Sequence, residues 1–298
     1  MRNVVRVLFF LILTFYCVLS YSEQVNVYVL NTGDIHESSK YLKKIKSYVD
    51  ITRTNHPGCV ILLDAGDMLT QFPFSKYVSP QDRKTRDLAS TTPKGEKMLE
   101  WASTMKYDAI LIGNHDMIAG ANILQKLLNR YNLPLIAANL SHPSLYLSRY
   151  KIVQLNFRLK TGKAVSIRVG IIGISDQDQK DYHFPNKADK EKLKTYPVYN
   201  PTINKIIDEV AKQSDFIILL SHNWDNVDRD SVSALKSNKI CAIIGGHSHK
   251  LLNEKDNGKT LIKSGVHGSN VGCTKITWDS DAHKVLTVTA ENKPMKEE

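Results

Sequence analysis

The sequence predicts an α/β fold with a largely parallel sheet, and its first half supplies the main evidence. Short apolar runs rich in β-branched residues alternate there with longer stretches of helical periodicity. Strands of a parallel sheet are covered on both faces, so they form nearly continuous apolar runs, and the connections between them are usually helices. The predicted strands are VNVYVLN (25–31), CVILLDAG (59–66), DAILIG (108–113) and PLIAAN (134–139). The predicted helices lie at 39–54, about 93–105 and 119–131.

The second half repeats this alternation after a different middle segment. KIVQLNFRL and AVSIRVGIIGIS flank KTGK, which predicts an antiparallel hairpin that turns at Gly162. A helix, a strand, a helix and a strand are then predicted at TINKIIDEVAKQ, FIILLS, DSVSALKSN and ICAIIGG. At the end of the chain, three consecutive antiparallel strands are predicted at KTLIKSG, NVGCTKITWD and HKVLTVTAE.

Two polar segments, 78–94 and 176–199, interrupt the alternation and are predicted to be loops. The sequence has neither an internal repeat nor a linker between domains. We therefore expect a single catalytic domain over residues 23–298.

The N-terminus has the composition of a secretory signal. Residues 1–6 hold two arginines and no acid, and the apolar run at 7–19 is 13 residues long. A membrane-spanning helix needs about 18–20 such residues. Ser20 and Ser22 supply small side chains for cleavage, so residues 1–22 are predicted to be a signal peptide and the protein to be secreted or periplasmic. An uncleaved N-terminal anchor is the alternative, and no membrane span is expected in the mature chain.

The chain is basic. The formal net charge is +10, and removal of Arg2 and Arg6 leaves 10 − 2 = +8. This charge suits a small anionic substrate or an anionic envelope surface, but the lysines are scattered and favour a solvated face. No arginine-rich run or interleaved aromatic residues indicate a nucleic-acid groove. Three cysteines, Cys59, Cys241 and Cys273, lie in apolar runs and are expected to be buried small hydrophobic residues, with one disulfide among them as the alternative. The oligomeric state is left open.

Polar, metal-capable residues follow five of the predicted strands. In open α/β sheets the carboxyl ends of the strands form the ligand crevice. The residues at these ends are Asp34 and His36; Asp67; Asn114, His115 and Asp116; His222; and His247 and His249. They are therefore expected to meet at one edge.

The types of these residues indicate a metal centre with open positions. Residues two apart in an extended segment point the same way, which would bring Asp34 together with His36, and His247 together with His249. Imidazole and carboxylate ligands suit Zn, Mn or Fe(II), and the absence of cysteine argues against a closed structural zinc site. Seven candidate ligands exceed what one ion needs. Two ions about 3.5–4 Å apart that share a carboxylate would use them all.

The series GDIH, GD, GNHD, SH and GHSH resembles the signature of the calcineurin-like metallophosphoesterases, over nearly the whole mature chain. It is similar in particular to the catalytic N-terminal domain of secreted 5′-nucleotidases and nucleotide-sugar hydrolases. Supporting stretches are KGEKMLEWASTMKYDAILIGNHD (94–116), LPLIAANL (133–140) and SGVHGSNVG (264–272). The resemblance implies a four-layer α/β/β/α sandwich with two metal ions at the sheet edge.

The same resemblance implies a role for each site residue. One metal would be held by Asp34, His36 and His249. The other would be held by Asn114, His222 and His247, with Asp67 bridging the two. His115 stands where the family has its catalytic histidine, and Asp116 would orient its ring. A metal-bridging hydroxide would then attack phosphorus while His115 assists the leaving group.

Two departures from the family leave the substrate open. The secreted 5′-nucleotidases usually have a C-terminal domain that binds the base, and the sequence, which ends at Glu298, is expected to lack one. Met117 also replaces a residue that is generally aromatic. Recognition is then expected from loops of the catalytic domain, with the candidates Phe72, Phe74, Tyr77, Trp224 and Asp225.

The sequence therefore predicts a secreted, dimetal-dependent phosphoester hydrolase of nucleotide catabolism, with 5′-nucleotidase-like substrates. One alternative is a phosphodiesterase or a broad phosphomonoesterase. The other is a secreted binding protein that keeps the fold without turnover.

Overall fold

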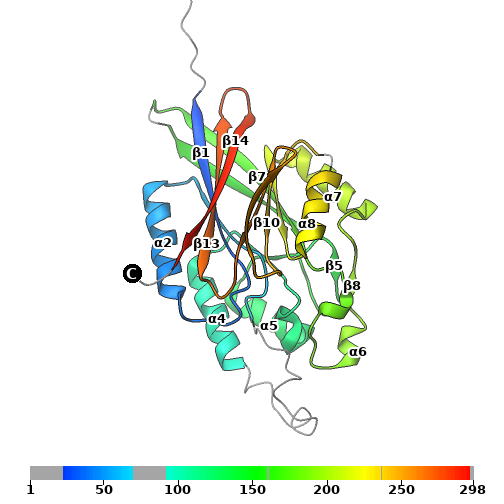
Figure 1. The fold of residues 1–298 in the computed structure, drawn as a ribbon. Coiled ribbons are helices and arrows are strands. Elements are labelled where there is room, and N and C mark those ends of the chain that lie inside the picture. The colour runs from blue at the N-terminus through cyan, green and yellow to red at the C-terminus, as the bar shows by residue number, and fades with distance from the viewer. Residues whose placement is uncertain (1–22, 70–91, 160, 236, 296–298) are drawn as a thin grey trace, which may run out of the picture.

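The computed structural model describes residues 23–69, 92–159, 161–235 and 237–295, and two six-stranded sheets form its centre (Figure 1). The first sheet has the order β14-β13-β1-β2-β3-β4. Its strands are β1 (Gln24–Thr32), β2 (Val60–Asp64), β3 (Ala109–Leu111), β4 (Leu135–Ile136), β13 (Asn270–Asp279) and β14 (Lys284–Pro294). The strands β1 to β4 run parallel, whereas β13 and β14 are antiparallel to their neighbours.

The second sheet has the order β11-β12-β10-β9-β7-β6. Its strands are β6 (Tyr150–Arg158), β7 (Ala164–Ile174), β9 (Phe216–Ser221), β10 (Ile240–Gly245), β11 (Leu251–Asp256) and β12 (Lys259–Ser264). The pairs β7/β9, β9/β10 and β10/β12 are parallel. A small third sheet pairs β5 (Leu140–Ser141) with β8 (Lys194–Thr195).

Helices cover the outer faces of the sheets. They are α2 (Leu42–Asn55), α4 (Thr92–Met105), α5 (Ala121–Tyr131), α7 (Pro201–Gln213) and α8 (Asp225–Ala234). The four-residue helix α6 (Lys187–Lys190) has no buried residue, and short 3₁₀ turns lie at η3 (Asp116–Ala119) and η4 (Gln179–Asp181). On α7 the buried residues Ile203, Ile206, Ile207 and Val210 recur every three or four positions, which places one apolar face on the second sheet.

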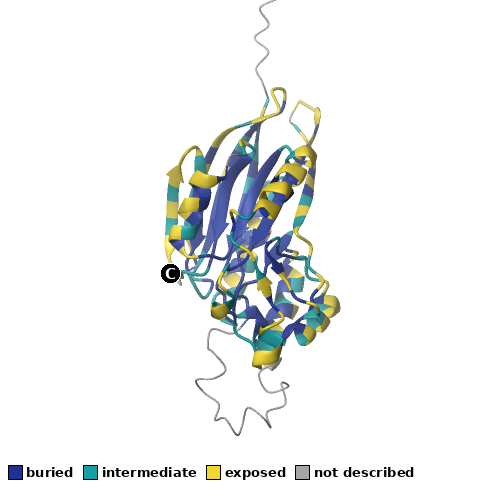
Figure 2. Cartoon of the chain, turned by 90° about the vertical axis from the view of Figure 1, so that its right-hand side faces the viewer, coloured by how far each residue is buried: buried dark blue, intermediate teal, exposed yellow. Residues whose placement is uncertain are grey.

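Three apolar cores separate four layers. Successive residues of a strand point to opposite faces, so Ile61 and Leu63 of β2 enter the core between the sheets while Leu62 packs in the core that contains residues of α2, α4 and α5. In the same way, Ile218 of β9 joins the inter-sheet core and Ile217 faces α7 and α8. Figure 2 shows the central strands buried along their length between helices with exposed outer faces. The predicted four-layer α/β/β/α arrangement is confirmed.

Two predicted elements need correction, and one strand was not predicted. Helix α8 begins at Asp225, five residues before the predicted start at 230, and its first turn holds Asp225 and Asp228, whose negative charge favours a helix N-terminus. Strand β12 does not belong with β13 and β14, because it pairs in parallel with β10 in the second sheet. Strand β11 was missed because it is mostly exposed, although the Asn257–Gly258 turn after it is typical of a hairpin.

Several predictions fall outside what the structure describes. Residues 1–22 lie there, so the signal peptide stays a prediction, as does the single domain over 23–298. Most of the 78–94 insert also lies there, together with Phe72, Phe74 and Tyr77. Within the described ranges, none of the helices has the length and apolar character needed to cross a bilayer.

Candidate metal centre

The predicted ligands converge where the carboxyl ends of the two sheets meet. Asp34 and His36 follow β1, Asp67 follows β2 and Asn114 follows β3, all in the first sheet. His222, His247 and His249 follow β9 and β10 in the second sheet. The two edges touch directly, because Nδ1 of His222 lies 2.7 Å from the carbonyl oxygen of Ala65.

Five of these residues have left-handed backbone conformations. The φ angles are 50° for Asp34, 49° for His36, 54° for Asp67, 75° for His247 and 60° for His249. Such angles are uncommon for residues other than glycine and cost about 1–3 kcal/mol each, so they concentrate where function requires them. The predicted extended spacing is therefore wrong as the reason for convergence. Sharp turns at the strand ends bring the side chains together.

The turns also need glycine between the strand ends. Gly66 has φ of 96°, and a Cβ there would lie 2.8 Å from both Gly113 N and His222 Nδ1. A Cβ on Gly113 would collide with the Asp67 carboxylate. Any larger residue at either position would push the ligand loops apart.

The first ligand group contains Asp34, His36 and His249. The Nε2 atoms of the two histidines are 3.0 Å apart. Oδ1 of Asp34 lies 3.9 Å from Nε2 of His36 and 3.7 Å from Nε2 of His249. Ligands about 2.1 Å from a tetrahedral ion are about 3.4 Å from one another, so these atoms surround a space of the right size for one ion.

The second group contains Asn114, His222 and His247. Oδ1 of Asn114 is 3.1 Å from Nε2 of His222 and 3.0 Å from Nδ1 of His247. The Asn114 amide donates to the carbonyl oxygen of Asp181 at 3.0 Å, which turns its oxygen toward the imidazoles. The spacing again matches that of ligands around a single ion.

Asp67 lies between the two groups. Its Oδ2 is 3.1 Å from Nε2 of His222 in the second group and 4.0 Å from Nε2 of His36 in the first. It also shares a metal-capable cluster with Asp34 and His222. One carboxylate oxygen within reach of both groups is the geometry expected of a bridging ligand.

The charges of the cluster also fit cations. Asp34 and Asp67 are each 1% exposed. Burial raises the pKa of Asp34 to about 8 and lowers the pKa of His36 and of His247 to about 3. Burial opposes ionised Asp67 as well, yet the neighbouring His222 holds the pKa of its carboxyl below the usual range. Neutral imidazoles bind metals and buried carboxylates need opposite charge, so the donor set fits divalent cations.

A comparison with protein families agrees with this geometry. The model of the calcineurin-like phosphoesterase family matches residues 27–251. The chain belongs to the calcineurin-like phosphoesterase family. The resemblance seen in the sequence is thereby confirmed, and with it the prediction of a phosphoesterase. The family implies divalent metal ions, and the ligand groups above are the candidates to hold them.

The relatives of this phosphoesterase are distant. An uncharacterized metallophosphoesterase of Bacillus subtilis, YunD, is 24% identical over 92% of this chain and 54% of its own. A 5′-nucleotidase of Homo sapiens is 25% identical over 75% of this chain and 38% of its own. The chain thus spans about half or less of the length of these relatives. The solved structure of YfkN from Bacillus subtilis covers 92% of both chains at 20% identity with a TM-score of 0.72, which confirms the fold.

In this phosphoesterase His115 lies beside the Asp67 carboxylate. Its backbone N–H donates to Oδ1 of Asp67 at 2.8 Å, and its Nε2 is 4.0 Å from Oδ2 of the same carboxylate. The ring stacks on His183 at a centroid distance of 4.2 Å. The side chain is 14% exposed, so it can face a substrate at the open side of the cluster.

Asp116 holds the loops together. Its carboxylate accepts the backbone N–H groups of Asp67, Leu69 and Gly113 at 3.1, 3.0 and 2.8 Å. These three bonds join the loops after β2 and β3. The predicted role of Asp116 in orienting the His115 ring stays a prediction.

Two residues near the cluster, Asp176 and His183, were not predicted from the sequence. Both lie in the segment 176–199 that is predicted to be a loop, but Asp176 also stands directly after the predicted strand AVSIRVGIIGIS, so strand-end reasoning points to it. The two recognition candidates that the structure describes, Trp224 and Asp225, differ in exposure. Trp224 is 52% exposed, and its ring centroid lies 4.3 Å from that of His247. Asp225 is 7% exposed and pairs with Lys250 and Lys263. Its part in recognition stays a prediction.

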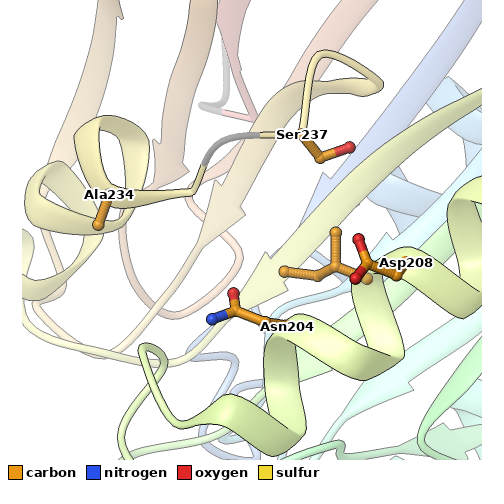
Figure 3. A pocket seen from close by; sticks show the side chains of 5 residues that line it. Asn204, Asp208, Ala234 and Ser237 are labelled. Atoms are coloured by element: carbon orange, nitrogen blue, oxygen red, sulfur yellow. The ribbon is translucent and has the colours of Figure 1, made fainter.

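A separate hollow of about 440 Å³ lies between α7 and α8 (Figure 3). It is lined by Asn204, Ile207, Asp208, Ala234 and Ser237. None of these residues belongs to a ligand group, so the hollow is not part of the metal centre.

Proposed function

We propose that this chain is a dimetal-dependent phosphoester hydrolase whose preferred substrates are small phosphomonoesters of the 5′-nucleotide type. The observation behind the proposal is the position of Asp67 Oδ2, within 4.0 Å of nitrogen ligands from both groups and beside His115. Two divalent cations, when bound, would supply Lewis acidity at phosphorus and lower the pKa of water.

The residues of the chain do the remaining work. The two ligand groups, which both adjoin Asp67, would hold the cations, and Asn114 would contribute a neutral oxygen that leaves net positive charge for the phosphate. His115 Nε2 would give a proton to the leaving oxygen as the ester P–O bond breaks and water adds to phosphorus. Proton donation from such a position contributes about 10²–10⁴-fold to turnover.

Two features favour a substrate with a planar group. Trp224 presents a half-exposed indole beside His247, and a base or aryl ring stacked on an aromatic side chain gains about 1–3 kcal/mol. The similarity to the human 5′-nucleotidase adds support for a nucleotide. The predicted export through residues 1–22 is part of the same proposal, and N-terminal sequencing of the exported protein should place its start near Glu23.

The test compares three esters on the same protein. The protein is stripped of metal, reloaded with Mn or Zn, and assayed with AMP, p-nitrophenyl phosphate and bis-p-nitrophenyl phosphate. Metal-restored release of phosphate from AMP, well above the rates on the other two, would support the proposal. Preferred cleavage of the diester, or equal cleavage of all three, would replace it with the phosphodiesterase or broad phosphatase alternative. No hydrolysis of any of the three esters, with both metals bound, would favour a binding protein.

A further inference from the structure

Asp176 brings an additional buried carboxylate to the metal centre. It lies two residues after the end of β7, separated from the strand by Ser175, and is 2% exposed. Its Oδ1 accepts the backbone N–H of Asp178 at 2.9 Å, and its main-chain oxygen accepts the Tyr182 hydroxyl at 2.9 Å. Its Oδ2 has no hydrogen-bond partner among the described residues. A buried polar atom without a partner costs about 1–3 kcal/mol, so this one needs an explanation.

The atom opposite Oδ2 belongs to a metal ligand. Nε2 of His247 lies 3.7 Å from it and likewise lacks a hydrogen-bond partner within the described part of the chain. The other ring nitrogen, Nδ1, faces Asn114 Oδ1 at 3.0 Å and is therefore the nitrogen placed for metal binding. A neutral imidazole that binds through Nδ1 has its proton on Nε2, where it needs an acceptor.

We propose that Asp176 is a positioning residue of the metal centre, in which Oδ2 accepts the Nε2–H of His247 and aims Nδ1 at the ion of the second ligand group. The proposal rests on the proposed function for the presence of that ion. A movement of about 0.8 Å would bring the two atoms to the usual length of a charge-assisted hydrogen bond. Such a bond fixes the tautomer and the ring orientation and raises the basicity of the ligand, and losing it lowers metal affinity about 10–100-fold.

A third cation is the competing explanation. Ligand atoms of Asp176, Asp181 and His247 lie within 4.8 Å of one another. An ion there would need Nε2 of His247 as a ligand while Nδ1 binds the ion of the second group, which requires an imidazolate without any proton. A hydrogen bond to Asp176 needs no such deprotonation. Asp181 is therefore the matched control, because it belongs to the cation alternative and not to the hydrogen bond.

The experiment measures metal binding, not only turnover. Wild type, Asp176→Ala, Asp176→Asn and Asp181→Asn are stripped of metal and titrated with Zn²⁺ against a chromophoric chelator, and bound zinc is counted by elemental analysis. We expect two ions in every protein, with one affinity 10–100-fold weaker in Asp176→Ala, a smaller loss in Asp176→Asn, whose amide oxygen still accepts, and none in Asp181→Asn. Thermal unfolding of the metal-free proteins shows whether each variant folds.

Two results would overturn the proposal. One is a third ion in wild type that Asp181→Asn removes, which would establish a cation at this cluster. The other is unchanged affinity at both sites in folded Asp176→Ala. Hydrolysis of AMP by the same wild-type preparation separates the two proposals. Two bound ions without turnover would refute the proposed function only. Turnover by wild type, together with unchanged metal affinities in Asp176→Ala, would refute the role of Asp176 only.

Discussion

Replacing Lys263 with methionine tests how the histidine loops of the second sheet are held. The Lys263 side chain is 1% exposed and lies in β12, beneath the loops after β9 and β10. Its ammonium donates to the carbonyl oxygens of Asn223 at 2.7 Å and Gly246 at 2.9 Å. These residues adjoin His222 and His247 in sequence, so a single buried cation joins the loops of two metal ligands.

The magnitude follows from what the ammonium neutralises. It pairs with Asp228 Oδ2 at 2.8 Å and Asp225 Oδ1 at 3.0 Å. Asp228 is 1% exposed, whereas Asp225 keeps a second cation in Lys250. Methionine keeps most of the lysine stem but leaves the Asp228 carboxylate buried without a counter-charge. Breaking one side of a buried pair costs about 3–5 kcal/mol. For a domain of this size that corresponds to a fall in Tm of roughly 6–20 °C.

Urea and thermal unfolding of the metal-free protein measure this loss. Adding Asp228→Asn to Lys263→Met should recover part of it, because the second change removes the unpaired charge. Lys250→Met is the control: its side chain is 65% exposed, and pairs at that exposure contribute about 0–1 kcal/mol. A loss below about 1 kcal/mol for Lys263→Met, or no recovery in the double variant, would refute the reasoning.

Three further predictions concern the site itself. His115→Ala should lower turnover by about 10²–10⁴-fold with metal content near wild type, since its ring belongs to neither ligand group; rates and elemental analysis measured together decide this, and unchanged turnover would contradict its role. Metal binding at pH 7 should release protons. Burial raises the pKa of Asp34 to about 8. For His222, burial acts to lower the pKa, but the carboxylates of Asp67 and Asp34 outweigh burial and raise the pKa to about 10. Both groups are therefore protonated before metal binds, and the apparent metal affinity should rise from pH 6 to 8. A pH indicator in weak buffer should report the released protons. If no protons are released, the result would count against these pKa values. Trp224→Ala should raise KM about 5–150-fold for AMP and p-nitrophenyl phosphate but not for glycerol phosphate, and an equal change on all three would exclude stacking.

The candidate ligands could be predicted because each follows an apolar strand. A run such as FIILLS before His222 marks a buried strand, and a polar residue directly after it must lie at the sheet edge. The same rule applied to AVSIRVGIIGIS would have reached Asp176. Asp176 is hidden in the sequence because the residues that follow it look like an ordinary polar loop.

Other features depend on contacts that no local pattern contains. KTLIKSG is an equally good strand in either sheet, and only packing decides that β12 pairs with β10 instead of β13. The left-handed backbone at Asp34 and His36 is likewise set by neighbouring loops, since His36 N–H donates to Asp67 O at 3.0 Å. The role of Lys263 is hidden for the same reason, because its four partners lie between 17 and 40 residues away along the chain.

Each ligand group draws on both sheets, and this links metal binding to their packing. Asp34 and His36 of the first sheet meet His249 of the second, and Asn114 of the first meets His222 of the second. Sliding one sheet over the other would break both groups, so ions bound at these positions would stabilise the native alignment by mass action, by about 4 kcal/mol at a thousand times Kd. The large apolar core between the sheets needs no ion. Metal removal should therefore make the ligand loops at the sheet edge more mobile while the two packed sheets stay folded. Small zinc domains behave differently, because they unfold without metal.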